Sequence, residues 1–410
     1  MADQSHVLRE RLVEGLKARG FIRSASVEAA FRQVPRHAFL PGVPIDQAYT
    51  DRAFPTKHRD GMPISSSSQP AIMAIMLEQL GLQPGQRVLE VGAGTGYNAA
   101  LMAYLVGERG HILTVDIDDD LAASALRNLA AAGFQSLEVI CADGGFGYPA
   151  QAPYDRIILT VGTWDIAPAW IEQLARDGRL VLPLSLRHVQ KSVAFEWRNN
   201  HLESVSIADC GFMRLRGAFA GPERVIPLGP SPGPRVSIDS DRPVDSDLLF
   251  EALTAPGVEV PTGLQVRLRE LFGSLSLWLA VEDPDFCSLG IYAEPAVVDR
   301  SPVPLLFEWP SGKKKERSTM ALLGQRGFVA LARPSNASPE ASTPLSIVSF
   351  GAEADLVNRM RAHLVAWDTA GRPSTESLRI SAYPKSLGRP QTSGGRTVEK
   401  HWTTLVISAG

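Results

Sequence analysis

A glycine-rich segment carries the clearest chemical signal in the sequence. The apolar stretch 88–91 runs into Gly92, Gly94 and Gly96, and apolar residues at helical spacing follow from Tyr97. Glycine lets a backbone approach a ligand closely, and the first N–H groups of a helix have no partner inside that helix. The segment therefore predicts a ligand-binding turn between a strand and a helix.

Two acidic residues narrow the choice of ligand. Glu90 lies just before the glycines, and Asp116 ends the next apolar stretch, where an acid can accept both hydroxyls of a ribose. The dinucleotide fingerprint requires a third glycine where this chain has Tyr97, and Glu90 would repel a pyrophosphate. A nucleoside with ammonium and sulfonium groups suits these acids, so S-adenosyl-L-methionine is the expected cofactor. An NAD-dependent oxidoreductase is the disfavoured alternative.

A second polar turn follows the third apolar stretch, 137–141. There Asp143 and Gly144 begin a tight turn, in which Asp143 can accept the exocyclic amine of adenine. A plain Asp-Gly turn is the structural alternative. The position after the third strand of the series favours a cofactor contact.

The elements that must position these residues alternate in type. Short apolar strands are expected at 87–91, 111–116, 137–141, 156–161 and 179–184, with helices between them. This alternation is typical of a parallel sheet covered on both faces, which is an α/β doubly wound fold. Residues 42–68 show no clear periodicity, and antiparallel strands are expected at 190–210.

Composition shifts divide the rest of the chain. We expect an N-terminal helical and substrate-loop segment at 1–70, a cofactor-binding domain at 71–220, a Pro/Gly-rich linker at 221–240 and a C-terminal α+β domain at 241–410. Within the last domain the patterns predict strands near 275–281, 303–308, 327–332, 345–350, 377–383 and 402–407, and a helix at 353–368. No motif assigns this domain a role.

The bulk composition excludes several classes of protein. Of 410 residues, 44% are hydrophobic and 21% charged, with a net charge of −3, which is a globular composition without the positive charge that nucleic-acid binding requires. The three cysteines show no metal-ligand spacing, so no metal is expected. Neither a signal peptide nor a membrane-spanning stretch is evident, and the cytoplasm is the expected location. Oligomeric state is left open.

Several motifs in order resemble the protein-L-isoaspartate O-methyltransferases. They cover about residues 25–190. The motifs are Val34-Pro35-Arg36-His37-Ala38-Phe39, Ala48-Tyr49-Thr50-Asp51-Arg52-Ala53, Ser68-Gln69-Pro70, the glycine turn, Asp143-Gly144, Ala152-Pro153-Tyr154-Asp155 and Gly178-Arg179-Leu180-Val181-Leu182-Pro183. The resemblance implies the Rossmann-like fold of class I methyltransferases.

The resemblance also implies roles for individual residues. Ser68 matches the serine that holds the substrate carboxylate in this family, and its structural alternative is a helix cap before Pro70. Cofactor contacts are implied for ten residues: Ser65, Ser66, Ser67, Glu90, Gly92, Gly94, Gly96, Asp116, Asp143 and Gly144. A carboxylate is already ionised at neutral pH, so neither His37 nor His58 is required as a general base.

The activity implied is carboxyl O-methylation of L-isoaspartyl or D-aspartyl residues of proteins or peptides, which begins repair through a succinimide. Two departures leave the substrate open: the loop 162–166 contains Trp164 and Asp165 where the family often has small residues and prolines, and the chain continues far past residue 190. The alternative is an aspartyl methyltransferase that tailors a ribosomally made precursor peptide. A non-catalytic scaffold is disfavoured because the glycine turn and its acids are intact.

Overall fold

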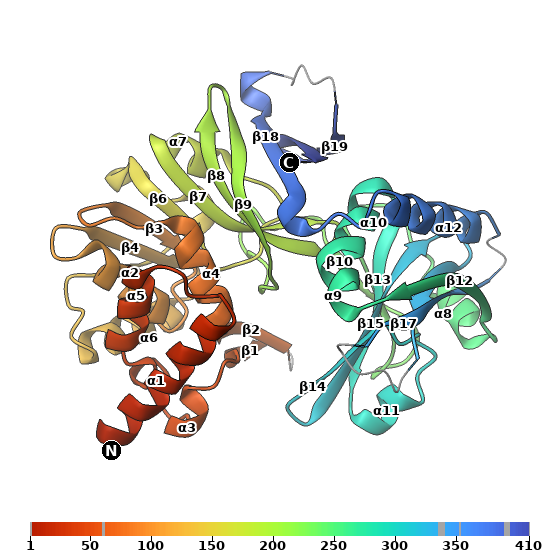
Figure 1. The fold of residues 1–410 in the computed structure, drawn as a ribbon, viewed down its shortest axis with the longest axis horizontal. Helices are drawn as coiled ribbons and strands as arrows, with labels where there is room; N and C mark the ends of the chain where they lie inside the picture. The colour runs from red at the N-terminus through yellow and green to blue at the C-terminus, as the bar shows by residue number, and fades with distance from the viewer. Residues whose placement is uncertain (1, 60–61, 335–340, 352–353, 389–393, 410) are drawn as a thin grey trace. The chain divides into compact units, whose positions relative to one another are not determined.

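The computed structural model describes residues 2–59, 62–334, 341–351, 354–388 and 394–409. The chain forms two compact units (Figure 1). Unit 1 contains residues 1–184, 190–220 and 379–408, and unit 2 contains 185–189 and 221–378. Among the described residues, no helix combines the length and the apolar character needed to cross a membrane.

A ten-stranded sheet forms the centre of unit 1, in the order β19-β20-β18-β9-β8-β7-β6-β3-β4-β5. Strands β7, β6, β3, β4 and β5 are parallel neighbours, as the helix–strand alternation predicts. The strands are β3 (Arg87–Val91), β4 (His111–Asp116), β5 (Glu138–Cys141), β6 (Tyr154–Leu159), β7 (Leu174–Leu186), β8 (Val189–Arg198), β9 (His201–Asp209), β18 (Leu378–Pro384), β19 (Arg396–Glu399) and β20 (Thr403–Ala409).

The helices of unit 1 begin and end where local chemistry favours it. Helix α4 starts with Pro70 in its first turn, where a missing N–H costs nothing, and it ends at Gly81 in the left-handed conformation. The helices are α1 (Ala2–Ala18), α2 (Ala25–Gln33), α3 (Ile45–Ala48), α4 (Pro70–Leu80), α5 (Tyr97–Val106), α6 (Asp119–Ala131) and α7 (Pro168–Gln173), with 3-10 turns at Arg36–Phe39, Gly144–Phe146 and Pro149–Gln151.

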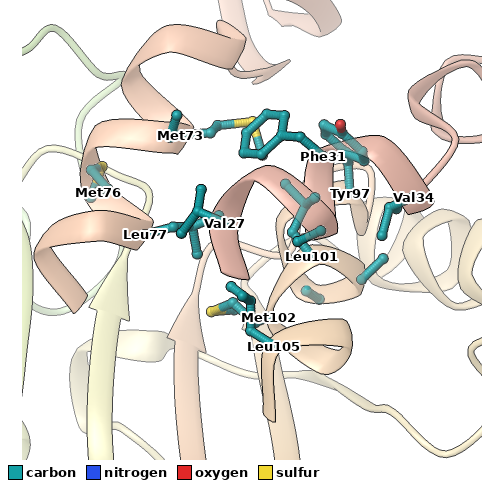
Figure 2. Packing of buried hydrophobic residues seen from close by; sticks show 14 of the residues in the cluster. Val27, Phe31, Val34, Met73, Met76, Leu77, Tyr97, Leu101, Met102 and Leu105 are labelled. Atoms are coloured by element: carbon teal, nitrogen blue, oxygen red, sulfur yellow. The ribbon is translucent and has the colours of Figure 1, made fainter. Parts of the chain in front are cut away.

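The N-terminal helices share one core with the cofactor-binding domain. Figure 2 shows Phe31 of α2 between Met73 of α4 and Tyr97 of α5. Tyr97 is 2% exposed and contacts the rings of Phe31 and Phe39. Residues 1–70 therefore pack as part of unit 1 rather than as a separate segment.

A short hairpin precedes α4. Strands β1 (Phe54–Arg59) and β2 (Met62–Ser67) pair antiparallel with two irregularities in their register. The sequence showed no periodicity here because the outward positions of β1 and the serines of β2 are all polar. The hairpin carries three of the four predicted loop serines.

The C-terminal end of the chain departs from the expected domain division. Strand β18 pairs with β9, and β20 and β19 extend the same sheet, so residues 379–408 belong to unit 1 (Figure 1). A domain that runs uninterrupted from 241 to 410 is therefore wrong at its C-terminal end. Local patterns predicted β18 and β20 close to their observed positions but did not predict β19, and they carry no information about which sheet a strand joins.

Unit 2 is built on an eight-stranded antiparallel sheet, in the order β10-β11-β13-β15-β16-β17-β12, with β14 beside β15. Met320 and Leu322 of β15 lie in one core and Ala321 and Leu323 in another, so both faces are buried. The elements are β10 (Arg224–Pro227), β11 (Arg235–Ile238), α8 (Ser246–Thr254), β12 (Val258–Val266), α9 (Leu268–Glu270), α10 (Ser276–Glu282), β13 (Phe286–Ala293), α11 (Pro295–Asp299), β14 (Phe307–Ser311), β15 (Lys314–Leu323), β16 (Phe328–Ala332), β17 (Thr343–Phe350) and α12 (Ala354–Thr369).

Two local predictions for unit 2 need correction. The stretch 275–281 was expected as a strand but is mostly helix α10, because a short apolar run fits either a buried strand or a buried helix. The expected linker 221–240 contains β10 and β11, which pair with each other and with β13. Its prolines lie largely at the ends of these strands and in the turn between them.

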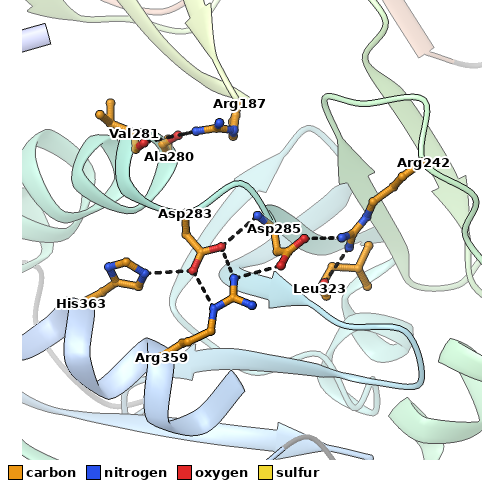
Figure 3. Close-up of polar contacts among 9 residues, drawn as sticks. All are labelled: Arg187, Arg242, Ala280, Val281, Asp283, Asp285, Leu323, Arg359 and His363. Carbon is orange, nitrogen blue, oxygen red and sulfur yellow. Dashed lines mark hydrogen bonds and ion pairs between the residues drawn. The ribbon is translucent and has the colours of Figure 1, made fainter. Parts of the chain in front are cut away.

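A paired polar cluster lies in unit 2. Asp283, 1% exposed, accepts hydrogen bonds from His363 at 2.9 Å and from the Arg359 guanidinium, which also contacts Asp285 (Figure 3). Arg242 donates to the other side of Asp285 at 2.5 Å. Burial alone would raise the pKa of Asp283, but these donors together hold it below its ordinary value.

Candidate active site

The glycine turn adopts a conformation that only glycine takes without strain. Gly92, Gly94 and Gly96 have φ angles of 103°, 53° and 86°. A Cβ atom on Gly92 would lie 2.6 Å from Oγ1 of Thr160, at the end of the neighbouring strand β6. The turn therefore needs glycine at position 92 both for its backbone and for the space beside Thr160.

The serine loop lies against this turn. A Cβ atom on Gly94 would be 3.6 Å from the carbonyl oxygen of Ser66, which is ordinary van der Waals contact. Ser65 accepts a hydrogen bond from the Thr56 hydroxyl at 3.0 Å. The hydroxyl of Ser67 is buried and has no partner among the residues that the structure describes. The structure thus brings the predicted serines and the predicted turn together.

Asp51 caps helix α4 in place of Ser68. Its Oδ1 accepts a hydrogen bond from the N–H of Ala71 at 2.9 Å. Its Oδ2 accepts a hydrogen bond from the side-chain amide of Gln69 and forms an ion pair with Arg19. The N-cap residue itself is Gln69, whose side chain makes no capping bond. Because Asp51 fills this role, the helix-cap alternative for Ser68 loses its main support.

Arg36 fixes the backbone on which Ser68 lies. Its side chain is fully buried, and its two terminal nitrogens donate to the carbonyl oxygens of Ala48, Thr50, Arg52 and Ser68 at 2.8–3.0 Å. A buried cation is costly unless it is hydrogen-bonded, and four carbonyl oxygens provide most of that compensation here, although Nε has no partner among the described residues. One side chain thereby ties the loop 48–52 to the serine loop.

Asp116 ends β4 beside the glycine turn. Its Oδ2 accepts the N–H of Gly94 at 3.0 Å, and its Oδ1 accepts the N–H of Asp118 at 3.2 Å. The residue is 8% exposed, and burial raises the pKa of its carboxyl against the effect of these bonds. Each oxygen has a further lone pair, so the carboxylate can still accept two hydroxyls. Its role toward a ribose stays a prediction.

Glu90 is a buried acid with one oxygen unsatisfied. Its Oε1 accepts a hydrogen bond from the Asn98 amide at 2.8 Å, whereas Oε2 has no partner within the described part of the chain. Burial raises the pKa of Glu90 to about 7, an effect that the Asn98 amide and the Thr114 hydroxyl oppose. A cationic ligand beside the turn would satisfy this oxygen, and a pyrophosphate would not. The site therefore fits a sulfonium nucleoside.

Asp143 holds its own turn closed. Its Oδ1 accepts the N–H of Gly145 at 2.9 Å, and its Oδ2 accepts the N–H of Ala218 at 2.7 Å. A Cβ atom on Gly144 would lie 2.4 Å from Val91 at the end of β3, so this turn packs directly against the strand that carries the glycines. The turn-forming alternative is thus visible, and contact with adenine remains a prediction.

A cluster of ion pairs flanks Asp116. Asp118 forms ion pairs with Arg216 at 2.6 Å and with Lys57 at 3.2 Å. Lys57 forms a further ion pair with Asp120 at 2.5 Å. Arg216 lies in the segment 210–220, and Lys57 in strand β1. These pairs, led by the hydrogen bond from Arg216, lower the pKa of Asp118.

The two nearby histidines offer no base at the turn. His37 bonds to the Tyr49 hydroxyl at 2.7 Å, and burial lowers its pKa. His58 lies on an outward position of β1. Sequence reasoning did not assign roles to Arg36, Asp51 or Asn98. A charged or amide residue inside an otherwise apolar stretch was the available signal for Arg36 and Asn98.

The parallel sheet, the glycine turn and the acids after β3 and β4 define a class I methyltransferase. A family model described as protein-L-isoaspartate(D-aspartate) O-methyltransferase matches residues 7–218. The chain belongs to this family, is a methyltransferase, and takes S-adenosyl-L-methionine as its methyl donor.

Individual relatives agree with this family. A protein-L-isoaspartate O-methyltransferase from Methanopyrus kandleri is 41% identical over 230 residues, which cover 54% of this chain and all of the relative. One from Hyperthermus butylicus is 41% identical over 220 residues, covering 52% of this chain and 89% of the relative. A solved structure named protein-L-isoaspartate O-methyltransferase matches 91% of this chain and 96% of its own, with a TM-score of 0.50 and 25% identity.

Proposed function

We propose that this methyltransferase transfers a methyl group to the free carboxylate of L-isoaspartyl or D-aspartyl residues in proteins or peptides. The ester formed closes to a succinimide, which begins the repair of the damaged residue. One observation carries the proposal: the serine loop 65–68, which Arg36 anchors through the Ser68 carbonyl, lies so close to the glycine turn that a Cβ atom on Gly94 would be 3.6 Å from the Ser66 carbonyl oxygen. The names of the relatives support the isoaspartyl acceptor.

The cofactor would be held by acids on the strand ends. In this proposal Asp116 accepts hydrogen bonds from the ribose hydroxyls, Glu90 faces the positive charge, and Asp143 accepts a hydrogen bond from the adenine amine. S-adenosyl-L-methionine, when bound, supplies a methyl group on a sulfonium, and the C–S bond breaks as an acceptor oxygen bonds to the methyl carbon. Both opposite charges disappear in that step, and no proton has to move.

Ser68 would orient the acceptor carboxylate. Its hydroxyl donates a hydrogen bond to one carboxylate oxygen and leaves the other free to attack. A neutral donor is suited to this task because a cation would reduce the nucleophilicity of the acceptor. Correct alignment of two bound reactants can lower a barrier by roughly 7–11 kcal/mol. The chain therefore needs a positioned serine rather than a strong base.

The test compares two peptides that differ only in one residue, L-isoaspartyl or L-aspartyl. The purified full chain is incubated with labelled S-adenosyl-L-methionine and each peptide, and methyl ester formation is followed by mass spectrometry. We expect transfer to the isoaspartyl peptide and little to the other. Transfer to the aspartyl peptide alone would favour precursor-peptide tailoring, and transfer to neither would overturn the proposal.

A further inference from the structure

The last residues of unit 1 are bonded to the loop that follows β6. Asp165 of this loop is 4% exposed, and its Oδ2 accepts the backbone N–H of Trp402 at 2.6 Å. Its Oδ1 accepts the hydroxyl of Thr403 and the N–H of Ile166. Residues 396–408, which form β19, β20 and the turn between them, are called the C-terminal hairpin below.

These bonds make the loop and the hairpin one rigid piece. A buried carboxylate is costly unless donors satisfy it, and hydrogen bonds to an ionised group are about twice as strong as neutral ones. Two of the three donors to Asp165 come from the hairpin. The conformation of the loop 162–166 therefore depends on residues more than 200 positions further along the chain.

Four aromatic side chains form a continuous row over this piece. The centroid of the Trp402 ring lies 6.5 Å from that of Trp164 and 4.9 Å from that of Phe219, and Phe219 lies 5.0 Å from Phe146. Phe146 is 55% exposed, and the other three are half-buried. The Lys400 ammonium lies 5.1 Å from the Trp164 ring centroid. Exposed aromatic side chains that touch one another are a feature of binding surfaces.

This aromatic row borders the proposed methyl-transfer site. Trp164 follows the carboxyl end of β6, next to the strand that ends in Glu90 and the glycine turn. At the other end of the row, Phe219 packs on Gly145, where a Cβ atom would come within 2.2 Å of its ring. The row thus spans the strand ends from the Asp143 turn to the loop 162–166.

The chemistry itself does not require the hairpin. The Methanopyrus relative is matched over its whole length by 54% of this chain, which is too little to extend from the family-model region to residue 379. That relative is named for the same reaction and has no counterpart of the hairpin. The hairpin is therefore absent from at least one relative named for this reaction.

We propose that the C-terminal hairpin forms part of the acceptor-binding surface, in which Trp402 and Trp164 contact the peptide residues flanking the reacting carboxylate. The proposal rests on the proposed function and narrows its substrate to peptide segments that can lie across the aromatic row. Aromatic side chains provide large contact areas with few rotatable bonds, which suits them to peptide recognition.

The test measures acceptor binding in full-length variants. Trp402→Ala should raise KM for the preferred peptide by about tenfold, while kcat and the Kd for S-adenosyl-L-methionine stay unchanged. Trp402→Phe keeps an aromatic ring and should restore most of the affinity. Trp309→Ala removes a partly exposed tryptophan of unit 2 and should leave all three constants unchanged. Thermal unfolding of each variant verifies that it is folded.

Two outcomes would overturn this proposal: an unchanged KM in a folded Trp402→Ala variant, or a loss confined to cofactor affinity. Failure of the proposed function is a separate result, because it concerns which peptide the wild-type chain methylates. If only the aspartyl peptide is methylated, the same comparison of Trp402→Ala with the wild type is made on that peptide.

Discussion

Buried acids in the two units have opposite surroundings. Asp283 of unit 2 accepts hydrogen bonds from His363, Arg359 and the N–H of Asp285, so its negative charge is compensated within the protein. Glu90 of unit 1 receives one amide, and its second oxygen has no partner among the described residues. The pKa of Asp283 is lowered and that of Glu90 is raised to about 7. A buried acid whose oxygen has no partner within the protein can obtain that partner from a ligand.

Two arginines show the same contrast. Arg359 is 40% exposed and binds carboxylates, so it holds helix α12 to the segment 283–285. Arg36 is fully buried and binds only carbonyl oxygens of two loops. The first arrangement stabilises packing, and the second positions a backbone for chemistry. Four residues of unit 1 are substituted to test the comparison, from the largest expected effect to the smallest. Each substitution has a control variant elsewhere in the chain.

Arg36→Met should have the largest effect. It removes four hydrogen bonds from a charged donor, one of them buried and three partly buried, and each such bond contributes about 1.5–3 kcal/mol, so we expect a loss of about 3 kcal/mol or more in the free energy of unfolding. Methyl transfer should fall even where the protein remains folded. Urea unfolding and turnover measure the two effects.

Arg359→Met serves as the matched change in unit 2. It should lower stability but leave kcat and KM of the folded enzyme unchanged. Arg36→Lys keeps the charge but cannot reach four carbonyls, and it should behave like Arg36→Met in turnover. Normal turnover in folded Arg36→Lys would contradict a positioning role for the guanidinium.

Glu90→Gln should remove a pH dependence from the free energy of unfolding. A carboxyl whose pKa is raised on folding from 4.5 to about 7 favours the folded state at low pH, and this contribution is lost as pH rises through 7. Glutamine stays neutral, so the variant should be more stable than the wild type by roughly 3 kcal/mol at pH 8 and equal to it near pH 4. Urea unfolding across this range measures the difference.

The pH dependence that Glu90 gives to cofactor affinity should be opposite to the one it gives to stability. The wild-type affinity for S-adenosyl-L-methionine should rise more steeply between pH 6 and 8 than that of Glu90→Gln, because only ionised Glu90 attracts the cation. Asp283→Asn gives the contrast in unit 2: its lowered pKa favours the folded state at high pH, and this contribution is lost as the solution becomes acidic. If the affinity for S-adenosyl-L-methionine depends on pH identically in Glu90→Gln and in the wild type, Glu90 is excluded from the site.

Ser68→Ala should lower kcat by about 10- to 100-fold, the value of one hydrogen bond to a charged group. The Kd for the cofactor should stay close to that of the wild type, because the proposal assigns Ser68 to the acceptor and not to the cofactor. Ser377→Ala, an exposed hydroxyl of unit 2, should change neither constant. Lost cofactor binding in a folded Ser68→Ala variant would assign the residue to the donor instead.

Asp116→Ala should weaken cofactor binding by about 1–3 kcal/mol, with little change in kcat at saturation. Isothermal titration gives the affinity directly. Asp118→Asn tests the ion pairs beside it, which are partly buried and join Asp118 to Arg216 and Lys57 rather than to the proposed ribose, so this variant should lose less cofactor affinity than Asp116→Ala. Equal losses in both variants would show that Asp116 acts through the local backbone and not through a ribose.

Sequence patterns predicted those parts of the site that depend on local order. The turn at Gly92–Gly96, the acid at the end of β4 and the parallel strands each follow from neighbours in the chain, and the structure shows them as expected. The closeness of the serine loop to the glycine turn follows only from the family resemblance, which implies cofactor contacts for both. Periodicity alone showed nothing in 42–68.

The remaining features depend on contacts between distant residues. The side chain of Arg36 collects carbonyls up to 32 positions away, and Asp165 meets Trp402 at a separation of 237. No local pattern encodes such pairings. The helix at Ser276–Glu282 was misjudged for another reason, since its apolar run has no distinct period.

The interrupted path of the chain affects the order in which the protein can fold during synthesis. Unit 2, apart from residues 185–189, is complete at residue 378, whereas the unit that begins at the N-terminus still lacks β18, β19 and β20. Domains usually fold from the N-terminus as the ribosome extends them. Here the first sheet to begin is the last to be finished, and a late nonsense mutation would release a chain in which Asp165 lacks two of its three donors.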